Sequence, residues 1–405
     1  MIVNVTRRQA IAGAALTLLG STTAARAQGS VYRIGALNPV TGAGGTYGAG
    51  MQKTILFALD EVKRVGIDGR TLDVSAEDTQ TAPDAAVLAA RKLVDADHVD
   101  AILGTWSSSV SLAVQPITNG AGVLLFHVSS APALSAAAQN AKHLGWRFQA
   151  GSPRIGAAYA AIAERNGAKN PAFMAFNNDV QIASTNVFRA DWEKRGGKIA
   201  ASVVYEPNRT SYAAELQKIL AAKPDFIVVS GYLPDTTIIL REAYEAGNTA
   251  KIVIPGWAFG PSLVSALGND VLEGLIVFDS VPDVDGPAFK AFDAGYQKAM
   301  GTSGLANVYA AMCYDMVNVL ALALQKAGPS ANNEAIAGVI REIAGPPGET
   351  VTSFAEGKAA LKSGKAINYE GASGPLDFDE NGDAISVFGV NVVHGGKPER
   401  KYVLK

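Results

Sequence analysis

Short runs of apolar residues alternate with longer amphipathic segments along most of the chain. Segments such as 83–97, 182–197 and 236–247 carry apolar residues at helical spacing, and the last two end in glycine, which is typical of a helix C-terminus. Strands that alternate with helices of this length predict right-handed βαβ units and a parallel sheet. The apolar runs predict strands at 32–37, 71–78, 100–105, 122–128, 171–176, 201–205, 225–231, 251–256 and 274–280.

This alternation runs twice, once over residues 31 to about 149 and again over 170–280. A long helical stretch is predicted at about 287–327, and 374–405 has the pattern of a β-hairpin region with turn chemistry at Asn381-Gly382. Two α/β lobes fit these patterns better than one very large sheet. Ligands of such folds bind beyond the carboxyl ends of the strands, so a cleft between two lobes would face both sets of loops.

The composition is that of a globular protein, with 405 residues of which 48% are hydrophobic, long enough for two domains. The net charge is −2, and because the first 27 residues carry three arginines and no acid, the remainder lies near −5. A mildly acidic chain without a basic stripe is not typical of nucleic-acid binders, so we expect no nucleic-acid partner.

Residues 1–27 have the three parts of an export signal peptide. A basic "TRRQ" precedes the apolar "AIAGAALTLLG", which is too short to span a bilayer, and "ARA" supplies an A-x-A cleavage site before Gln28. Arg7 and Arg8 resemble a twin-arginine signal, but Ala10 and Ile11 fit that pattern only partly, so the general secretory route stays open. A frayed N-terminal helix is the alternative. We expect an exported protein.

The glycine-rich stretch "NPVTGAGGTYGAG" (38–50) lies between a predicted strand and an amphipathic helix, where nucleotide phosphates often bind. A dinucleotide fingerprint that starts at Gly42 needs glycine where Tyr47 stands, and a P-loop needs lysine directly after its last glycine, whereas Lys53 falls three positions after Gly50. Both motifs fail by register, and we expect no nucleotide cofactor. The glycines still allow the backbone of this stretch to approach a ligand closely, because glycine has no side chain.

Other catalytic signatures are equally weak. The four histidines are far apart, no G-x-S-x-G motif occurs, and the single cysteine, Cys313, lies in an apolar helical pattern that predicts a buried, inert thiol. One cysteine also excludes an intrachain disulfide. A Ser/His/Asp triad cannot be judged from spacing, because its members need not be adjacent in sequence. We expect neither an enzyme nor a metal site.

Two serine clusters are more informative. "GTWSSSVS" (104–111) and "HVSSAPALS" (127–135) each follow a predicted strand, so both lie at strand carboxyl ends of one lobe. Hydroxyls and free backbone N–H groups there suit a carboxylate through charge-assisted hydrogen bonds. The alternative is that these serines cap the next helix, and the two roles are compatible.

At these residues the chain resembles the periplasmic leucine/isoleucine/valine-binding protein family, the substrate-binding components of branched-chain-type ABC importers. The likeness covers essentially the whole mature chain and includes "IGALNPVTGAGGTYGAG", "AILGTWSSSVSLAVQPI" and "GPLDFDENGD". It implies the type I periplasmic binding protein fold, an α/β architecture of two Rossmann-like lobes with parallel sheets joined by three crossings. The implied division is a signal peptide at 1–27, lobe 1 at 28–149 plus 280–383, and lobe 2 at 150–279 plus 384–405.

The resemblance implies several ligand contacts in lobe 1. Tyr47 matches a family aromatic beside the ligand, and Ser108 matches the residue that binds the ligand carboxylate through its hydroxyl and N–H. Ser130 falls where the family usually has a threonine, if one residue is deleted. The glycine-rich stretch would then form one wall of the cleft, with flexible backbone that places Tyr47 over the ligand. Neighbouring candidates are Trp106, Ser107 and Ser129.

Lobe 2 departs from the family pattern. A family aromatic corresponds to Gln181, while Tyr232 is retained and Tyr309 matches an aromatic on the long helix. The family's acid, which pairs with a ligand ammonium, maps to Trp257, and an unpaired buried ammonium would cost several kcal/mol. These residues imply an aromatic-lined pocket for a carboxylate with a hydrophobic body, an aromatic acid rather than an amino acid. The alternative is that Trp257 packs in the core and another acid, such as Asp179, serves.

We therefore expect a monomeric periplasmic binding protein that captures a small carboxylate, either an aromatic acid or a branched-chain or hydrophobic amino acid, by hinge closure. Its expected partner is an ABC permease in the inner membrane, and no cofactor is expected. A ligand-sensing regulator of the same fold is one alternative, but no signalling domain is expected within 405 residues and no transmembrane anchor is predicted. A small-molecule α/β enzyme is the other alternative.

Overall fold

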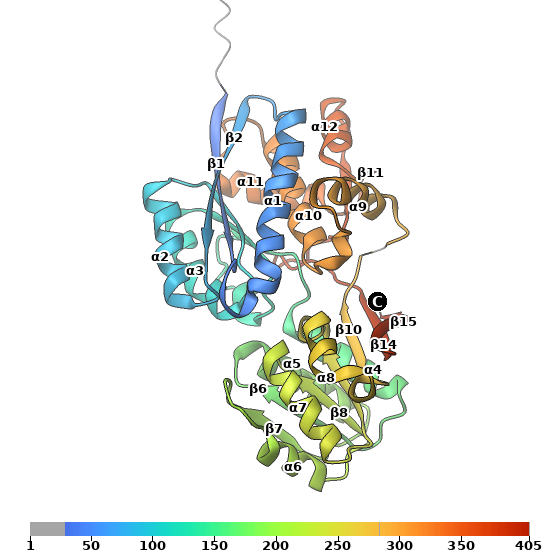
Figure 1. Ribbon diagram of the computed structural model, residues 1–405. Helices are drawn as coiled ribbons and strands as arrows, with labels where there is room; N and C mark the ends of the chain where they lie inside the picture. The colour runs from blue at the N-terminus through green and yellow to red at the C-terminus, as the bar shows by residue number, and fades with distance from the viewer. Residues whose placement is uncertain (1–28, 283, 405) are drawn as a thin grey trace, which may run out of the picture.

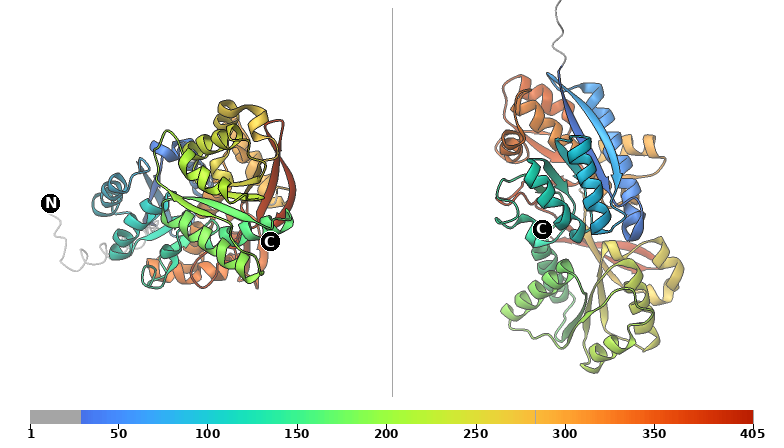
Figure 2. Two further views of the ribbon diagram at one scale, coloured as in Figure 1. Left: turned by 90° about the horizontal axis from the view of Figure 1, so that it is seen from below. Right: turned by 90° about the vertical axis from the view of Figure 1, so that its left-hand side faces the viewer.

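The computed structural model describes residues 29–282 and 284–404. The predicted signal peptide at 1–27 lies outside the described residues. The chain forms two α/β lobes, one above the other in Figure 1 and in the right-hand view of Figure 2. Each lobe is built around its own sheet, as the repeated alternation of strands and helices predicts.

The upper lobe in Figure 1 (lobe 1) has a parallel five-stranded sheet in the order β2-β1-β3-β4-β5. The same lobe also contains a separate, small sheet of three strands in the order β11-β12-β13. The strands are β1 (Ser30–Asn38), β2 (Arg70–Asp78), β3 (Ala101–Gly104), β4 (Leu124–His127), β5 (Gly145–Arg147), β11 (Glu349–Val351), β12 (Ile367–Gly371) and β13 (Gly374–Pro375). The helices are η1 (Gly42–Gly44), α1 (Gly45–Val65), α2 (Pro83–Arg91), η2 (Lys92–Ala96), α3 (Ser108–Ala121), η3 (Pro132–Ser135), α9 (Pro287–Met300), η5 (Gly304–Ala306), α10 (Ala310–Ala327), α11 (Asn333–Ile343) and α12 (Phe354–Lys362).

The lower lobe (lobe 2) has a seven-stranded sheet in the order β15-β14-β10-β9-β8-β6-β7, in which β14 runs antiparallel to both of its neighbours, β10 and β15, and the other pairs are parallel. The strands are β6 (Pro171–Phe176), β7 (Ser202–Tyr205), β8 (Phe226–Ser230), β9 (Lys251–Pro255), β10 (Ile276–Ser280), β14 (Phe388–His394) and β15 (Lys397–Leu404). The helices are α4 (Ser152–Arg165), α5 (Asp179–Lys194), α6 (Ala213–Ala221), α7 (Leu233–Glu245), η4 (Gly256–Ala258) and α8 (Pro261–Leu272).

The chain crosses between the lobes three times: from β5 to α4, from β10 to α9 and from β13 to β14 (Figure 1). The lobe limits expected above, 28–149 plus 280–383 and 150–279 plus 384–405, stay a prediction.

Burial explains why the strands read as apolar runs. β3, β4 and β8 are buried at every position, because helices cover both faces of a parallel sheet. In lobe 1, α1 and α10 pack on one face, while α2 and α3 pack on the other. α10 is buried at 14 of its 18 positions, which makes it the central helix of that lobe.

All nine predicted strands are present, while β5, β11 and β12 were not predicted. Two predictions were wrong. The stretch 287–327 is not one helix, because Gly301 takes a left-handed φ of 74° and ends α9 before α10 begins. The C-terminal hairpin turns at Gly395-Gly396, both with positive φ, whereas Asn381-Gly382 lies in a tight turn between Asp379 and Asp383 in the third crossing.

Candidate functional site

A small cavity lies where the carboxyl ends of strands from both sheets face each other. Its volume is about 30 Å³, and its walls come from the loops after β3, β4, β5, β6, β8 and β9 and from the start of α10. Seven of the ten predicted site residues line it: Trp106, Ser108, Ser130, Gln181, Tyr232, Trp257 and Tyr309. Sequence reasoning missed three further lining residues, Val128, Gln149 and Val180.

On the lobe 1 side, the cavity is rich in hydrogen-bond donors. The Ser108 hydroxyl oxygen accepts the N–H groups of Ser130 and Ala131, each at 3.2 Å, so its own proton is free to be donated elsewhere. The Ser130 hydroxyl has no hydrogen-bond partner in the described part of the chain. Ser108 also begins α3, whose N-terminus has no side-chain cap. A helix N-terminus and two serine hydroxyls form a site suited to an anion.

A buried arginine stabilises the loop that follows β4, residues 128–135, which we call the serine loop. Arg147 is fully buried, and its Nε lies 2.8 Å from the Asp383 carboxylate. Its guanidinium donates to the carbonyl oxygen of Ala131 at 2.8 Å, to the Ser135 hydroxyl at 2.6 Å, and to the carbonyl of Ser129. The sequence offered no signal for this role, since Arg147 is one charged residue within an aromatic run, "GWRFQ".

Aromatic side chains join the two lobes above the cavity. The rings of Trp106 in lobe 1 and Tyr232 in lobe 2 have centroids 5.8 Å apart. Tyr47, in the first turn of α1, packs against Trp106 and Tyr309, with ring centroids at 5.8 Å and 5.4 Å. Its hydroxyl donates to the carbonyl oxygen of Trp257 at 3.0 Å, so a lobe 1 side chain hydrogen-bonds lobe 2 backbone.

Three predicted site residues do not line the cavity. Tyr47 lies behind the lining rings and makes the contact between lobes described above. The Ser107 hydroxyl lies 3.0 Å from the Ser109 hydroxyl on the protein exterior. The buried Ser129 hydroxyl donates to the Trp106 carbonyl oxygen at 3.0 Å, which stabilises the loop rather than facing the cavity.

The glycine-rich stretch has a packing role that differs from the predicted flexible wall. A Cβ on Gly48 would lie 1.9 Å from the Pro39 carbonyl oxygen, and one on Gly50 would lie 2.3 Å from Nδ2 of Asn307. Asn307 Nδ2 also donates to the Tyr47 carbonyl oxygen at 2.9 Å. The glycines therefore let the first turns of α1 pack closely against neighbouring segments, and this packing positions Tyr47.

On the lobe 2 side, the cavity presents amide and phenol groups. Gln181 lies in the first turn of α5, and its backbone N–H donates to Asn178 Oδ1 at 3.0 Å. Its side chain is buried, and Oε1 has no hydrogen-bond partner within the described chain. Trp257 is held in place by a bond from its indole Nε1 to the Gly231 carbonyl oxygen at 3.0 Å.

No aspartate or glutamate of the described chain lines this cavity. Asp179, the alternative acid considered above, is exposed at the start of α5. Asp279, at the end of β10, is buried behind Gly256, where an added Cβ would lie 2.2 Å from its Oδ2. Burial raises the pKa of Asp279 to about 7, and the charge of this carboxyl adds to the effect of burial in raising the pKa of Tyr47 to about 12.

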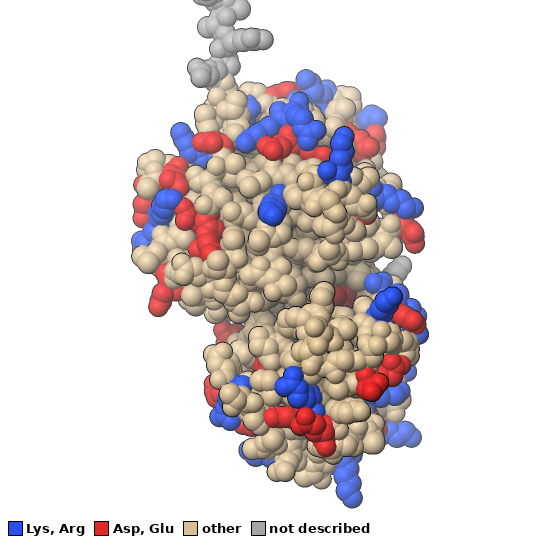
Figure 3. Space-filling model, in the orientation of Figure 1, with Lys and Arg blue, Asp and Glu red and all other residues tan. Residues whose placement is uncertain are grey.

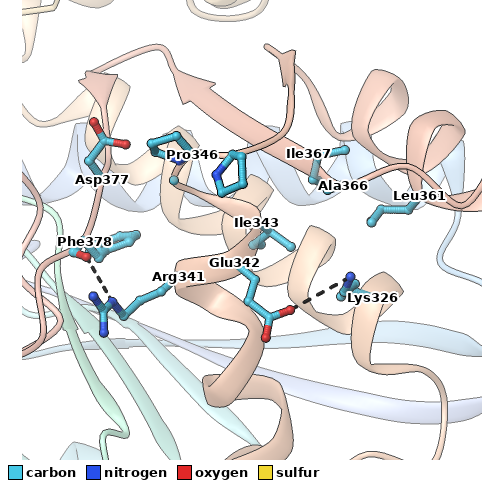
Figure 4. Close-up of a pocket in the computed structure, with 12 residues that line it drawn as sticks. Lys326, Arg341, Glu342, Ile343, Pro346, Leu361, Ala366, Ile367, Asp377 and Phe378 are labelled. Carbon is cyan, nitrogen blue, oxygen red and sulfur yellow. Dashed lines mark hydrogen bonds and ion pairs between the residues drawn. The ribbon is translucent and has the colours of Figure 1, made fainter.

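A larger cavity of about 580 Å³ lies within lobe 1, between the ends of α10 and α11 and the segment around β12 (Figure 4). Lys326 and Glu342 pair across it at 4.0 Å, and Arg341 Nε donates to the Phe378 carbonyl oxygen at 3.2 Å. Because only lobe 1 lines this cavity, a ligand bound there would have the same affinity for an open and a closed arrangement of the two lobes. We therefore take the cavity between the lobes as the candidate site.

Other chemistry has little support in the described residues. They contain no group of three or more histidine, cysteine, aspartate or glutamate side chains arranged to hold a metal ion. Burial raises the pKa of the Cys313 thiol, so it stays protonated. None of the described helices is both long and apolar enough to cross a membrane. On the face shown in Figure 3, positive and negative side chains are interspersed over both lobes.

Comparison with known proteins agrees with this architecture. The family model described as periplasmic binding protein matches residues 31–393. The leucine-, isoleucine-, valine-, threonine- and alanine-binding protein of Pseudomonas aeruginosa is 26% identical over 372 residues, which is 91% of each chain. A leucine-binding protein from Thermotoga maritima has a similar structure, with a TM-score of 0.79 and 27% identity over 92% of this chain and 98% of that chain.

A solute-binding protein from R. palustris, solved with benzoate, has the same fold, with a TM-score of 0.74 and 16% identity over 92% of this chain and 96% of that chain. At this identity the likeness is one of fold alone. The family match covers all or nearly all of every strand of both sheets except β15, and it includes every residue that lines the cavity between them. The chain therefore belongs to the periplasmic binding protein family, among the branched-chain-type substrate-binding proteins of ABC transporters.

Proposed function

We propose that this protein captures a small carboxylate with an aromatic or other hydrophobic body between its lobes, in the periplasm. It then delivers the ligand, as a monomer, to an ABC permease in the inner membrane. The observation that carries this proposal is the cavity itself, with serine hydroxyls and a helix N-terminus on lobe 1, aromatic rings from both lobes, and no acidic side chain among its described lining.

The carboxylate binds to lobe 1 in this proposal. Ser108 and Ser130 each offer a hydroxyl proton, and the uncapped N-terminus of α3 offers backbone N–H groups and the positive end of the helix dipole. Hydrogen bonds to a charged group contribute about 1.5–3 kcal/mol each. Arg147 keeps the serine loop in place, so little reorganisation is needed when the anion arrives.

The rest of the ligand packs against Trp106, Tyr232, Trp257 and Tyr309. An amino acid would bring a buried ammonium beside Trp257 with no cavity-lining acid to pair with it, at a cost of several kcal/mol. An acid without an amino group avoids that cost. The benzoate bound by a protein of the same fold fits this view.

A hydrophobic amino acid is the second candidate. The relative from Pseudomonas aeruginosa is named for binding such amino acids, and Asp279 offers a buried carboxyl behind Gly256 with one oxygen unpartnered among the described residues. With a pKa raised by burial to about 7, however, Asp279 is only partly ionised at neutral pH, which weakens it as a counter-charge for an ammonium.

Binding requires the lobes to move. The cavity of about 30 Å³ has room for one or two water molecules, whereas a benzene ring needs on the order of 150 Å³. Ligand entry therefore goes with separation of the Trp106–Tyr232 and Tyr47–Trp257 contacts. A ligand that contacts both lobes then favours the closed state.

Calorimetry and thermal-shift measurements test the proposal, using benzoate, a straight-chain aliphatic carboxylate, leucine and valine. We expect benzoate-class acids to bind and raise Tm, because a ligand that binds only the folded state stabilises it. Benzamide, which has the ring without the charge, is the matched control and should bind far more weakly. Stabilisation by leucine or valine together with no effect of any simple acid would overturn the proposal.

A further inference from the structure

Among the described residues that line the cavity, Gln181 alone has a buried side-chain polar atom without a hydrogen-bond partner. It is 1% exposed, lines the cavity beside Val180, and its Oε1 has no donor among the described residues. Buried acceptors are nearly always paired, so we expect the ligand to donate a hydrogen bond to this unpaired oxygen. The backbone N–H of Gln181 is held by Asn178, which anchors the residue in place.

The Tyr232 hydroxyl, which also lines the cavity, lacks an acceptor for its proton among the described residues. Its oxygen accepts from Asn178 Nδ2 at 3.3 Å, and no described residue accepts its proton. Burial raises the pKa of Tyr232, and the opposing effect of the Asn178 and Gln181 side chains is smaller, so the phenol is protonated at neutral pH. The proton of Tyr232 is free to be donated to a ligand.

An unpaired acceptor and a free donor therefore lie together on the lobe 2 side of the cavity. We propose that the ligand carries a hydroxyl group that donates to Gln181 and accepts from Tyr232, which makes a hydroxy-substituted aromatic carboxylate the preferred class. A hydroxyl is both donor and acceptor, whereas a methyl group satisfies neither partner, an ammonium cannot accept and a carboxylate cannot donate. This inference rests on the proposed function, because it assumes that the carboxylate binds to lobe 1.

The arrangement also couples specificity to closure. Ser108 and Ser130 belong to lobe 1, while Gln181 and Tyr232 belong to lobe 2. A ligand with a carboxylate at one end and a hydroxyl at the other bonds both lobes at once. It favours the closed state more than an acid that bonds lobe 1 alone.

The test is calorimetric titration of benzoate, 3-hydroxybenzoate, 4-hydroxybenzoate and 4-methylbenzoate into the wild-type protein and the Gln181→Met variant. We expect at least one hydroxybenzoate to bind the wild type about tenfold or more tighter than benzoate and 4-methylbenzoate, because a site with buried polar groups rejects ligands that leave them unpaired. In Gln181→Met, which has similar length but no amide acceptor, this preference should fall to within about threefold.

Gln297→Met, at an exposed position in α9, is the matched control and should keep the full preference. Tyr232→Phe removes the hydroxyl that donates to the ligand and leaves the Gln181 acceptor in place. It should reduce the preference partly, which keeps the test decisive if Gln181→Met folds poorly. Equal affinity of the wild type for benzoate and both hydroxybenzoates would overturn the inference alone, as would a preference that survives Gln181→Met. Failure of every benzoate to bind would overturn the proposed function as well.

Discussion

Ser107 and Ser108 are adjacent in the chain, but their hydroxyls have different surroundings. The Ser108 hydroxyl lines the cavity and its proton is free, whereas the Ser107 hydroxyl has the exposed Ser109 hydroxyl as its one partner among the described residues. We expect Ser108→Ala to weaken binding of a benzoate-class ligand by about 1–3 kcal/mol, since a hydrogen bond to a charged group is lost. Ser107→Ala should leave the calorimetric affinity unchanged. Equal affinities for the two variants would argue against a carboxylate at Ser108.

Asp279 is predicted to make stability depend on pH. Burial raises its folded-state pKa from 3.8 to about 7, so the folded protein holds this proton more tightly than the unfolded chain does. Its contribution is therefore fully present below about pH 4 and is lost as pH rises through 7, by up to about 4 kcal/mol. The charge of Arg400 opposes the rise in the pKa of Asp279, and the carboxylate in turn raises the pKa of the neighbouring phenols of Tyr47 and Tyr309.

Asp279→Asn tests this dependence, because it removes the ionisation and keeps an oxygen for the Ser280 N–H. We expect the variant to be more stable than the wild type at pH 8 and to match it at pH 4, as measured by urea unfolding. The exposed Asp270→Asn should change the free energy of unfolding by less than about 0.5 kcal/mol at both pH values. A constant difference between wild type and Asp279→Asn across this range would contradict the argument.

At the scale of elements, the short strand β5 supports the serine loop through Arg147. Its guanidinium bonds three groups of the loop and pairs with Asp383 in the third crossing. We expect Arg147→Met to lower the free energy of unfolding by about 3–5 kcal/mol, since the partly buried Asp383 loses its cation and the buried carbonyl oxygens of Ser129 and Ala131 lose their donor. Ligand affinity should fall as well, because the loop carries Ser130.

Arg195→Met provides the control for this prediction. Arg195 pairs with Glu164 at the surface, where both side chains are more than a third exposed, so its loss should cost at most about 1 kcal/mol. Urea unfolding and calorimetry of both variants give the comparison. Similar small losses for the two variants would show that Arg147 does not support the loop.

At the scale of the whole molecule, the bond from the Tyr47 hydroxyl to the Trp257 carbonyl oxygen links the lobes directly. Tyr47→Phe removes this bond and keeps the ring packing, so we expect the open form to gain about 0.5–1.5 kcal/mol relative to the closed form. Small-angle scattering of the ligand-free protein should then give a larger radius of gyration. Ligand affinity should fall by a similar free energy.

Tyr314→Phe is the matched control, because its hydroxyl bonds Glu61 within lobe 1 at 2.9 Å. It should leave the scattering curve and the affinity unchanged. If Tyr47→Phe also left both unchanged, the Tyr47–Trp257 bond would not contribute to closure.

Most of the fold could be predicted because its signals are local. Apolar runs mark strands that are buried on both faces, and helical spacing marks the helices between them. β5 and β11 were not predicted, because a strand of three residues is too short to show a pattern of apolar positions. The hairpin turn was misplaced because Asn381-Gly382 and Gly395-Gly396 both have turn chemistry, and only strand pairing distinguishes them.

The site was predicted in part. The serine turns were visible as residues that follow strands, and the family resemblance supplied the other candidates; seven of the ten candidates line the cavity. Gln149 and Arg147 were not visible, because neither carries a motif and both act through neighbours far away in sequence. Their roles depend on which loops the sheet order brings together.

The sequence by itself determined the succession of strands and helices, the two-lobed α/β class and the residue types at the strand ends, because these follow from local periodicity and turn chemistry. Three features could not be predicted without the folded structure: the bond from Tyr47 to the other lobe, the support of the serine loop by Arg147, and the unpaired Gln181 acceptor beside Tyr232. Those contacts join residues from different strands and lobes, and burial and pairing become defined only when the sheets have placed them.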